Sequence, residues 1–309
     1  MHRAWIGFLV LAGMAAAQPR LEVDQPAHGH IQDGRVDSYG VDAKAGDYFE
    51  VVGEPADIDI FLRLIGPDGK LLQVVNHLGF AGAEQLIQIA DQDGVYGVEV
   101  HPARDGRTGD YVIRLAARRP AEAADREGAA ADAKFRQILG ANSKDDANAM
   151  QDLAGTFARL GMVRRQALAW GAAGDLNAQK FSWTLAETAY GKALELWRGV
   201  KDRPGEGRIL LSRARLYYAL SNYTKCLDDT EHAAAIAREI HSAPMEASAL
   251  EISAAVYTRS GKPLDAVSNL EKTLAIRRAE GDRPGEASAL SNLGYAHFAL
   301  SHHDTAVAQ

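Results

Sequence analysis

The C-terminal part of the chain repeats its residue types every forty positions. Small residues recur at two points of this period, at Gly174, Ala214, Ala254 and Gly294 and again at Ala186, Cys226, Ala266 and Ala306. A fixed period of about 20 to 50 residues is typical of an array of stacked supersecondary units. Two small positions per period indicate two helices per unit, each packed closely against a neighbour.

The expected helix starts follow the same period. Each new unit carries a proline and, two residues later, a glutamate, in the pairs Pro204 and Glu206, Pro244 and Glu246, and Pro284 and Glu286. Proline is tolerated in the first helical turn, and glutamate suits the positive end of the helix dipole. The second helices should begin near Trp183, Tyr223, Pro263 and His303. The pattern predicts an all-α superhelical solenoid over residues 161–309 with a truncated last unit, whose turn falls at Leu300–His302.

These residues resemble the tetratricopeptide repeat in a forty-residue variety. The motif is Asn292-Leu293-Gly294-Tyr295-Ala296-His297, and the preceding unit has Ala254, Tyr257, Gly261, Ala266 and Leu270. The departures are the longer unit, Cys226 in place of alanine, and Thr230 in place of a large apolar residue. The resemblance implies that the first helix of each unit lines a concave face that binds protein or peptide partners.

Residues 18–118 alternate apolar and polar side chains in short segments, as strands do. The segments are Phe49–Val52, Ile58–Leu64, Leu71–Val75, Gln85–Ile89, Tyr96–Val100 and Tyr111–Leu115. Clusters of Gly, Asp and Pro separate them, which is typical of an antiparallel β-sandwich. Residues 119–160 are expected to hold a linker from Arg118 to Pro120 and an atypical first helical pair, Glu122–Leu139 and Asp145–Leu160, with a loop at Gly140–Ser143.

The strand-rich segment resembles the peptidase pre-C-terminal domain, a jelly-roll-like sandwich of exported proteins. The resemblance is carried by Asp37-Ser38-Tyr39, Ala45-Gly46-Asp47, Asp57-Ile58-Asp59-Ile60, Gly66-Pro67-Asp68-Gly69, Gly94-Val95-Tyr96 and Thr108-Gly109-Asp110-Tyr111. It implies an accessory binding or secretion module. A calcium site formed by Asp57, Asp59 and Asp68 is an alternative to their more common role as turn formers.

Residues 1–17 have the pattern of an export signal. A short positive head is followed by an apolar run from Ala4 to Met14, too short to span a bilayer, and by small residues at Ala15–Ala17. A membrane anchor is the alternative. The lone Cys226 excludes an internal disulfide framework, and it is expected to be a small buried thiol. We therefore expect a periplasmic or extracellular protein that is not bound to the membrane after signal cleavage.

The charge distribution argues against nucleic acid as a partner. Residues 18–120 carry 10 Lys and Arg against 17 Asp and Glu, whereas residues 121–309 carry 23 against 24. Neither part has the positive excess that nucleic-acid binding requires. The sequence leaves the oligomeric state open.

The sequence contains no motif for a reaction centre. It has no nucleophile elbow, phosphate loop, dinucleotide fingerprint or paired-histidine zinc helix. The histidine clusters His28–His30 and His302–Asp304 are expected in solvated turns, because no thiolate or further ligand completes a metal site. We therefore expect no catalytic residue, no cofactor and no metal.

Residues of the first helices form the candidate partner-binding surface. In the second unit, Arg208, Arg215 and Tyr218 share one helical face, and related positions follow in the next two units. The whole candidate set is Arg208, Arg215, Tyr218, Glu251, Arg259, Tyr295 and Phe298. Two arginines followed by aromatic residues would suit an extended peptide with an acidic group. The alternative is that these are ordinary exposed side chains. The Lys and Asn carboxylate clamp of chaperone-binding tetratricopeptide domains is not matched.

The order of signal, sandwich and repeats resembles the N-terminal part of exported bacterial proteins that end in a caspase-like CHAT peptidase domain. These residues supply neither the histidine nor the cysteine of that domain. The leading hypothesis is a non-enzymatic protein-interaction scaffold. The alternatives are the regulatory half of a CHAT peptidase and a carbohydrate-binding module joined to repeats. Because the last unit lacks most of its second helix, we expect the natural gene product to continue beyond Gln309 or to pair with another subunit.

Overall fold

A computed structural model describes residues 18–76, 82–104, 106–141 and 146–307, with side chains up to residue 300. The signal predicted for residues 1–17 lies outside these ranges, as do Asn142 and Ser143 of the predicted loop. The loop prediction is wrong for Gly140 and Ala141, which are the last residues of a helix. The N-terminal part is a β-sandwich of strands β1 (Ala27–Ile31), β2 (Asp37–Ala43), β3 (Asp47–Pro55), β4 (Ile60–Ile65), β5 (Leu71–Val75), β6 (Glu84–Ile89), β7 (Gly94–Pro102) and β8 (Gly109–Pro120).

The strands form two antiparallel sheets with the orders β1-β8-β3-β6 and β2-β7-β4-β5. Along β4 and β7 buried and partly exposed residues alternate, so that each strand turns one face to the core between the sheets. The six predicted strands are present, and the predicted sandwich is confirmed. Strands β1 and β2 were not predicted, because both are poor in β-branched residues.

The interpretation of His28–His30 as a turn is wrong, since these residues lie on β1. Gly29 faces the ring of Tyr111, where a side chain would lie about 2.1 Å from the nearest ring atom. The glycine therefore serves close packing rather than a turn. His30 Nδ1 lies 2.5 Å from Asp110 Oδ1 on β8.

The linker predicted at Arg118–Pro120 is also wrong, because these residues are the end of β8. Their backbone pairs with β3 from Asp47 to Phe49. Strand pairing extends β8 five residues past the predicted end, since the partner strand offers hydrogen bonds that the local sequence does not reveal. Helix α1 begins at Ala123, so only two residues separate the sandwich from the helices.

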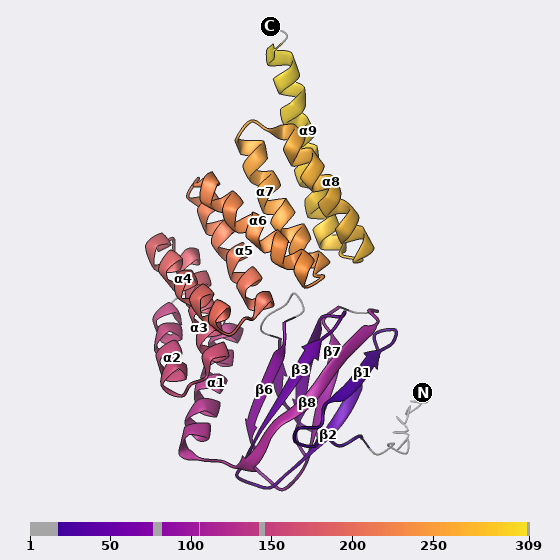
Figure 1. The fold of residues 1–309 in the computed structure, drawn as a ribbon, viewed down its shortest axis with the longest axis vertical. Helices are drawn as coiled ribbons and strands as arrows, with labels where there is room; N and C mark the ends of the chain where they lie inside the picture. Colours follow the sequence, from indigo (N-terminus) through magenta and orange to yellow (C-terminus); the bar gives the residue numbers. More distant parts are fainter. Residues whose placement is uncertain (1–17, 77–81, 105, 142–145, 308–309) are drawn as a thin grey trace, which may run out of the picture.

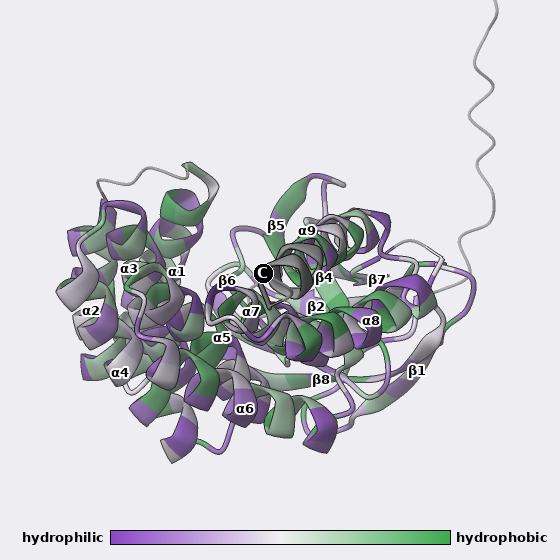
Figure 2. Ribbon diagram, turned by 90° about the horizontal axis from the view of Figure 1, so that it is seen from above, coloured by the Kyte–Doolittle hydropathy of each residue, from purple (hydrophilic) through white to green (hydrophobic). Residues whose placement is uncertain are grey.

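The helical array consists of hairpins of nearly constant size. Its helices are α1 (Ala123–Ala141), α2 (Ala147–Arg159), α3 (Val163–Gln179), α4 (Trp183–Gly199), α5 (Arg203–Ala219), α6 (Tyr223–Glu239), α7 (Ala243–Arg259), α8 (Pro263–Ala279) and α9 (Arg283–Val307). Helices α3 to α8 have 17 residues each. Their starts agree with the predicted period, and the predicted solenoid is confirmed. Figure 2 shows α4, α6 and α8 on the outer side of the arc and α5, α7 and α9 on its inner side.

Each turn from the α2–α3 turn to the α8–α9 turn contains one residue with a left-handed backbone. These residues are spaced twenty apart, at Gly161, Phe181, Lys201, Ser221, His241, Gly261 and Gly281. A left-handed residue ends a helix and reverses the chain. The forty-residue period is therefore two steps of twenty, each made of one helix and one three-residue turn.

The turn predicted at Leu300–His302 is wrong, because α9 continues through it to Val307. Residues 297–307 contain neither proline nor glycine to end the helix, so the local helix preference continues through the predicted turn. His302–Asp304 therefore lie in a helix, and the second helix predicted to begin near His303 is a continuation of α9.

The sandwich contacts the array at two separate places (Figure 1). At the first, the fully buried Arg165 of α3 bonds to the backbone oxygen of Gln85 on β6, and its Nε lies 2.8 Å from Asp132 Oδ1 of α1. This last contact is an ion pair without hydrogen-bond geometry. Burial lowers the pKa of Arg165 to about 10, which leaves it charged at neutral pH.

At the second place, the loop between β7 and β8 meets the turn between α8 and α9. Arg107 Nη2 lies 3.0 Å from Glu280 Oε2, and Arg104 Nη2 lies 3.6 Å from Asp282 Oδ2. The sandwich therefore spans from the early to the late units of the array.

Candidate functional site

Three inner helices enclose a cavity of about 300 Å³. It is lined by Arg215 and Tyr218 of α5, Ser248, Glu251, Ile252 and Ala255 of α7, and Asn292 of α9. We call this surface the inner groove. Its residues come together because helices of equal length and equal turns place positions forty apart side by side.

The inner groove has one cation at its α5 side. Arg215 is exposed, and no hydrogen bond or ion pair links it to another residue within the described part of the chain. Exposed arginine without a protein carboxylate can bind an incoming carboxylate in a bidentate manner. This end of the groove therefore suits an acidic group.

Glu251 faces the groove from α7 and is held by neighbours. Its Oε1 accepts hydrogen bonds from Ser288 Oγ at 2.6 Å and Asn292 Nδ2 at 3.1 Å. Its Oε2 lies 3.8 Å from Arg277 Nη2. These contacts fix the carboxylate, while Ile252 and Ala255 provide apolar surface between it and Arg215.

The remaining predicted residues lie around the groove rather than in it. Arg208 packs over Gly171 of α3 and pairs with Asp175 at 3.7 Å, so the predicted pair of arginines is not available as a pair. The guanidinium carbon of Arg259 lies 5.1 Å from the ring centre of Tyr218. Tyr295 and Phe298 on α9 are 64% and 59% exposed. The structure thus brings Arg215, Tyr218 and Glu251 together, with Arg259 beside them.

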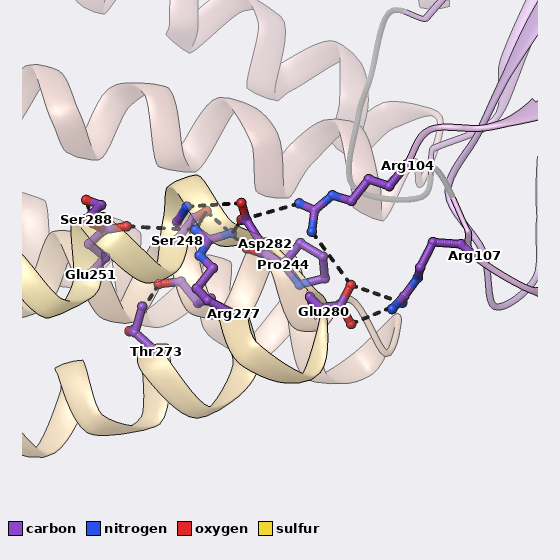
Figure 3. A network of polar contacts seen from close by, with 12 residues as sticks. Arg104, Arg107, Pro244, Ser248, Glu251, Thr273, Arg277, Glu280, Asp282 and Ser288 are labelled. Carbon is purple, nitrogen blue, oxygen red and sulfur yellow. Dashed lines mark hydrogen bonds and ion pairs between the residues drawn. The ribbon is translucent and has the colours of Figure 1, made fainter. Parts of the chain in front are cut away.

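Arg277 connects the inner groove to the sandwich, and the sequence analysis did not identify it. Its Nη2 bonds to Ser248 Oγ at 3.1 Å and its Nη1 to Asp282 Oδ2 at 3.0 Å. Figure 3 shows this network continuing from Glu251 through Arg277 and Asp282 to Arg104. Among the lining residues, Ile252 and Asn292 were also missed. Ile252 directly follows the predicted Glu251, and Asn292 lies one forty-residue period after Ile252.

The three aspartates considered as a calcium site do not form one in the described ranges. Asp57, Asp59 and Asp68 do not converge, because Asp68 pairs with Lys70 at 2.6 Å and Asp57 accepts the backbone N–H of Asp110. No group of three or more His, Cys, Asp or Glu side chains suited to a metal is present there. None of the described helices is long and apolar enough to cross a bilayer.

The fold defines a class of protein, a solenoid of helical hairpins joined to a β-sandwich. Residues 245–309 match the family model of the tetratricopeptide repeat. This match confirms the resemblance predicted from the repeat motif over those residues. No curated protein sequence matches the chain.

Solved structures of similar fold fall into two groups. A putative kinesin light chain with TPR-like repeats from Podosopora anserina is 14% identical, with a TM-score of 0.48, over 60% of this chain and 92% of that chain. BtubC from P. vanneervenii is 20% identical, with a TM-score of 0.43, over 60% and 68%. The pre-peptidase C-terminal domain of a Bacillus anthracis collagenase is 18% identical, with a TM-score of 0.27, over 32% and 93%.

Proposed function

We propose that this protein is a protein-interaction scaffold that binds an extended peptide segment of a partner in the inner groove. The proposal is carried by one observation, the exposed Arg215, which has no ion-pair partner among the described residues, beside Tyr218 and the fixed carboxylate of Glu251. An interaction scaffold is the role that a solenoid of tetratricopeptide type generally has, and the apolar lining supplies contact area.

The charges indicate which peptide would fit. An acidic side chain or chain end would pair with Arg215, and a backbone N–H or hydroxyl would donate to Glu251. Aromatic and aliphatic groups would pack on Tyr218 and Ile252. This replaces the predicted arginine pair by one arginine and one carboxylate that line the same groove.

We propose export to the periplasm or the cell exterior for the mature chain, on the pattern of residues 1–17 alone. A role as the regulatory half of a CHAT peptidase is a proposal of the same kind, based on the order of the segments. The candidate groove has the same use in either case, because a scaffold and a regulatory half both need a partner surface.

Selection from a random peptide library tests the groove directly. The mature chain should enrich peptides that carry an acidic residue next to an apolar one. The Arg215→Ala and Tyr218→Ala double variant should lose this enrichment, since it removes both the cation and the aromatic contact. Helical circular dichroism and the melting temperature should stay nearly unchanged, because both side chains contact solvent.

A matched control separates the groove from the rest of the surface. Arg126 on α1 is another exposed arginine, outside the groove, and Arg126→Ala should leave the enrichment intact. Loss of folding in the double variant would instead make Arg215 and Tyr218 structural. Unchanged enrichment in a folded double variant would reject the groove as the binding site.

A further inference from the structure

A second cavity, of about 490 Å³, lies between the sandwich and the turn that joins α6 to α7. Its sandwich side is the segment Ala56–Asp59 with Arg104 and Arg107, and its helical side is Ile240–Pro244 with Glu280. We call it the junction cavity. Small-molecule sites commonly have this volume and often lie where two domains meet.

One wall of the junction cavity is the N-terminus of α7. At the equivalent helix starts, Asp202 and Asp282 accept the backbone N–H of Gly205 and Gly285. At α7 this position is Ser242, which is only 5% exposed, makes no capping hydrogen bond, and has no side-chain partner within the described residues. The start of a 17-residue helix is electropositive, so this wall favours an anionic group.

Arg104 adds a second positive group to the same cavity. Its ion pairs are long, 3.6 Å to Asp282 and 3.9 Å to Glu280, and neither has hydrogen-bond geometry. Arg107, in contrast, bonds to Glu280 at 3.0 and 3.2 Å (Figure 3). Arg104 can therefore take a further carboxylate without leaving Glu280 unpaired.

The sandwich side of the junction cavity also carries two carboxylates. Asp57 is exposed and Asp59 is partly exposed, and both line the cavity on the segment between β3 and β4, across from the start of α7. Ile58, Ile240 and Pro244 supply apolar surface in the same cavity. A ligand that fits this arrangement carries a carboxylate, an ammonium group and apolar atoms between or beside them.

We propose that the junction cavity binds a short zwitterionic peptide with apolar side chains. The carboxylate lies at Ser242 and Arg104, the ammonium group lies at Asp57 and Asp59, and the side chains pack on the apolar surface. The proposal does not depend on the function of the inner groove, which is formed by other residues.

Calorimetric titration of the mature chain with dileucine tests the proposal. Dileucine should bind, and both N-acetyl-dileucine and dileucine amide should bind at least about tenfold more weakly, because each loses one charged contact. Absence of dileucine binding would overturn the proposal. If the amide or the acetylated form bound as tightly as dileucine, the proposal would also be overturned, since the site would then not recognise both the carboxylate and the ammonium group.

Two variants test whether dileucine binds in the junction cavity. Ala243→Trp fills the junction cavity without touching an ion pair, and it should abolish dileucine binding. Arg104→Gln should weaken binding about tenfold, while the matched sandwich variant Arg114→Gln should not change it. Circular dichroism checks folding in each case. Full binding by a folded Ala243→Trp variant would show that dileucine binds elsewhere and would reject the junction cavity.

Discussion

Cys226 shows how the repeat restricts side-chain size at a single position. The thiol is fully buried and packs with Ala214, Tyr217 and Val256. The residues equivalent to Cys226 in the other units are alanines. Burial raises the pKa of the Cys226 thiol to about 11. The thiol is therefore protonated at neutral pH and is not activated as a nucleophile.

Substitutions at Cys226 should depend on volume rather than chemistry. Cys226→Ala should be nearly neutral, whereas Cys226→Leu should lower the free energy of unfolding by about 1 to 3 kcal/mol through overpacking. Urea unfolding of the two variants measures the difference. Equal stability of Ala and Leu at this position would contradict the close approach of α5 and α6.

The raised pKa of the Cys226 thiol leads us to expect a loss of stability at alkaline pH. Its folded pKa of about 11 exceeds the ordinary value of 9.0, so its contribution is fully present below pH 9 and is lost as the pH rises toward 11. Because Cys226→Ala is expected to be nearly neutral at pH 7, the free energy of unfolding of the wild type should fall below that of the variant across this range, so that the two values diverge. Parallel curves between pH 8 and 11 would exclude the thiol as the cause of any alkaline loss.

Lys201 is an ordinary residue in a left-handed turn, with a φ of 55°. Side chains with a Cβ are disfavoured there, whereas glycine is not. Lys201→Gly should raise the free energy of unfolding by up to about 1 kcal/mol. Glu195→Gly in the middle of α4 is the control, and this change should lower the free energy of unfolding by about 1 kcal/mol. Destabilisation by both changes would show that the Lys201 side chain itself holds the turn.

At the scale of helices, equivalent ion pairs also recur every forty residues. Arg198 pairs with Glu206 at 2.7 Å, Arg238 with Glu246 at 3.2 Å, and Arg278 with Glu286 at 2.7 Å. Each pair joins the end of a second helix to the start of the next first helix. The glutamate after each proline, interpreted from the sequence as a dipole partner, thus also links successive units.

Arg165 of α3 links its own helix to α1 and to strand β6. Arg165→Met should cost about 3 to 5 kcal/mol, because it leaves the buried carboxylate of Asp132 with fewer partners. Adding Asp132→Leu should recover part of this loss, since the buried carboxylate left by Arg165→Met is then removed. A double-mutant cycle by urea unfolding gives the coupling. Additive losses in the cycle would mean that the two side chains do not act as a pair.

The sequence predicts elements better than their mutual contacts. The helix starts up to α9, the six predicted strands and the grouping of Arg215, Tyr218 and Glu251 follow from local patterns and from the period. The junction of Arg107 with Glu280, which are 173 residues apart, has no local pattern. The pairing of Arg208 with Asp175 was missed for the same reason, because it joins two different helices.

At the scale of the whole molecule, the sandwich should be held to the late units by charge. Arg107→Glu should detach this contact, and the combined Arg107→Glu and Glu280→Arg variant should restore it, because the pair is only reversed. Small-angle scattering should show a larger radius of gyration for the single variant. The wild type should expand in the same way at high salt. A compact single variant would mean that the pair of Arg107 and Glu280 is not needed to hold the sandwich against the late units.

The two contacts of the sandwich lie at opposite ends of the array, at α1 and α3 and at the α8–α9 turn. A solenoid that contacts only its own neighbours bends and stretches like a spring, since small rotations between units add along its length. Here any such elastic deformation must break one of the two contacts. The sandwich therefore restricts the curvature of the superhelix, and with it the distance from α5 to α9 across the inner groove.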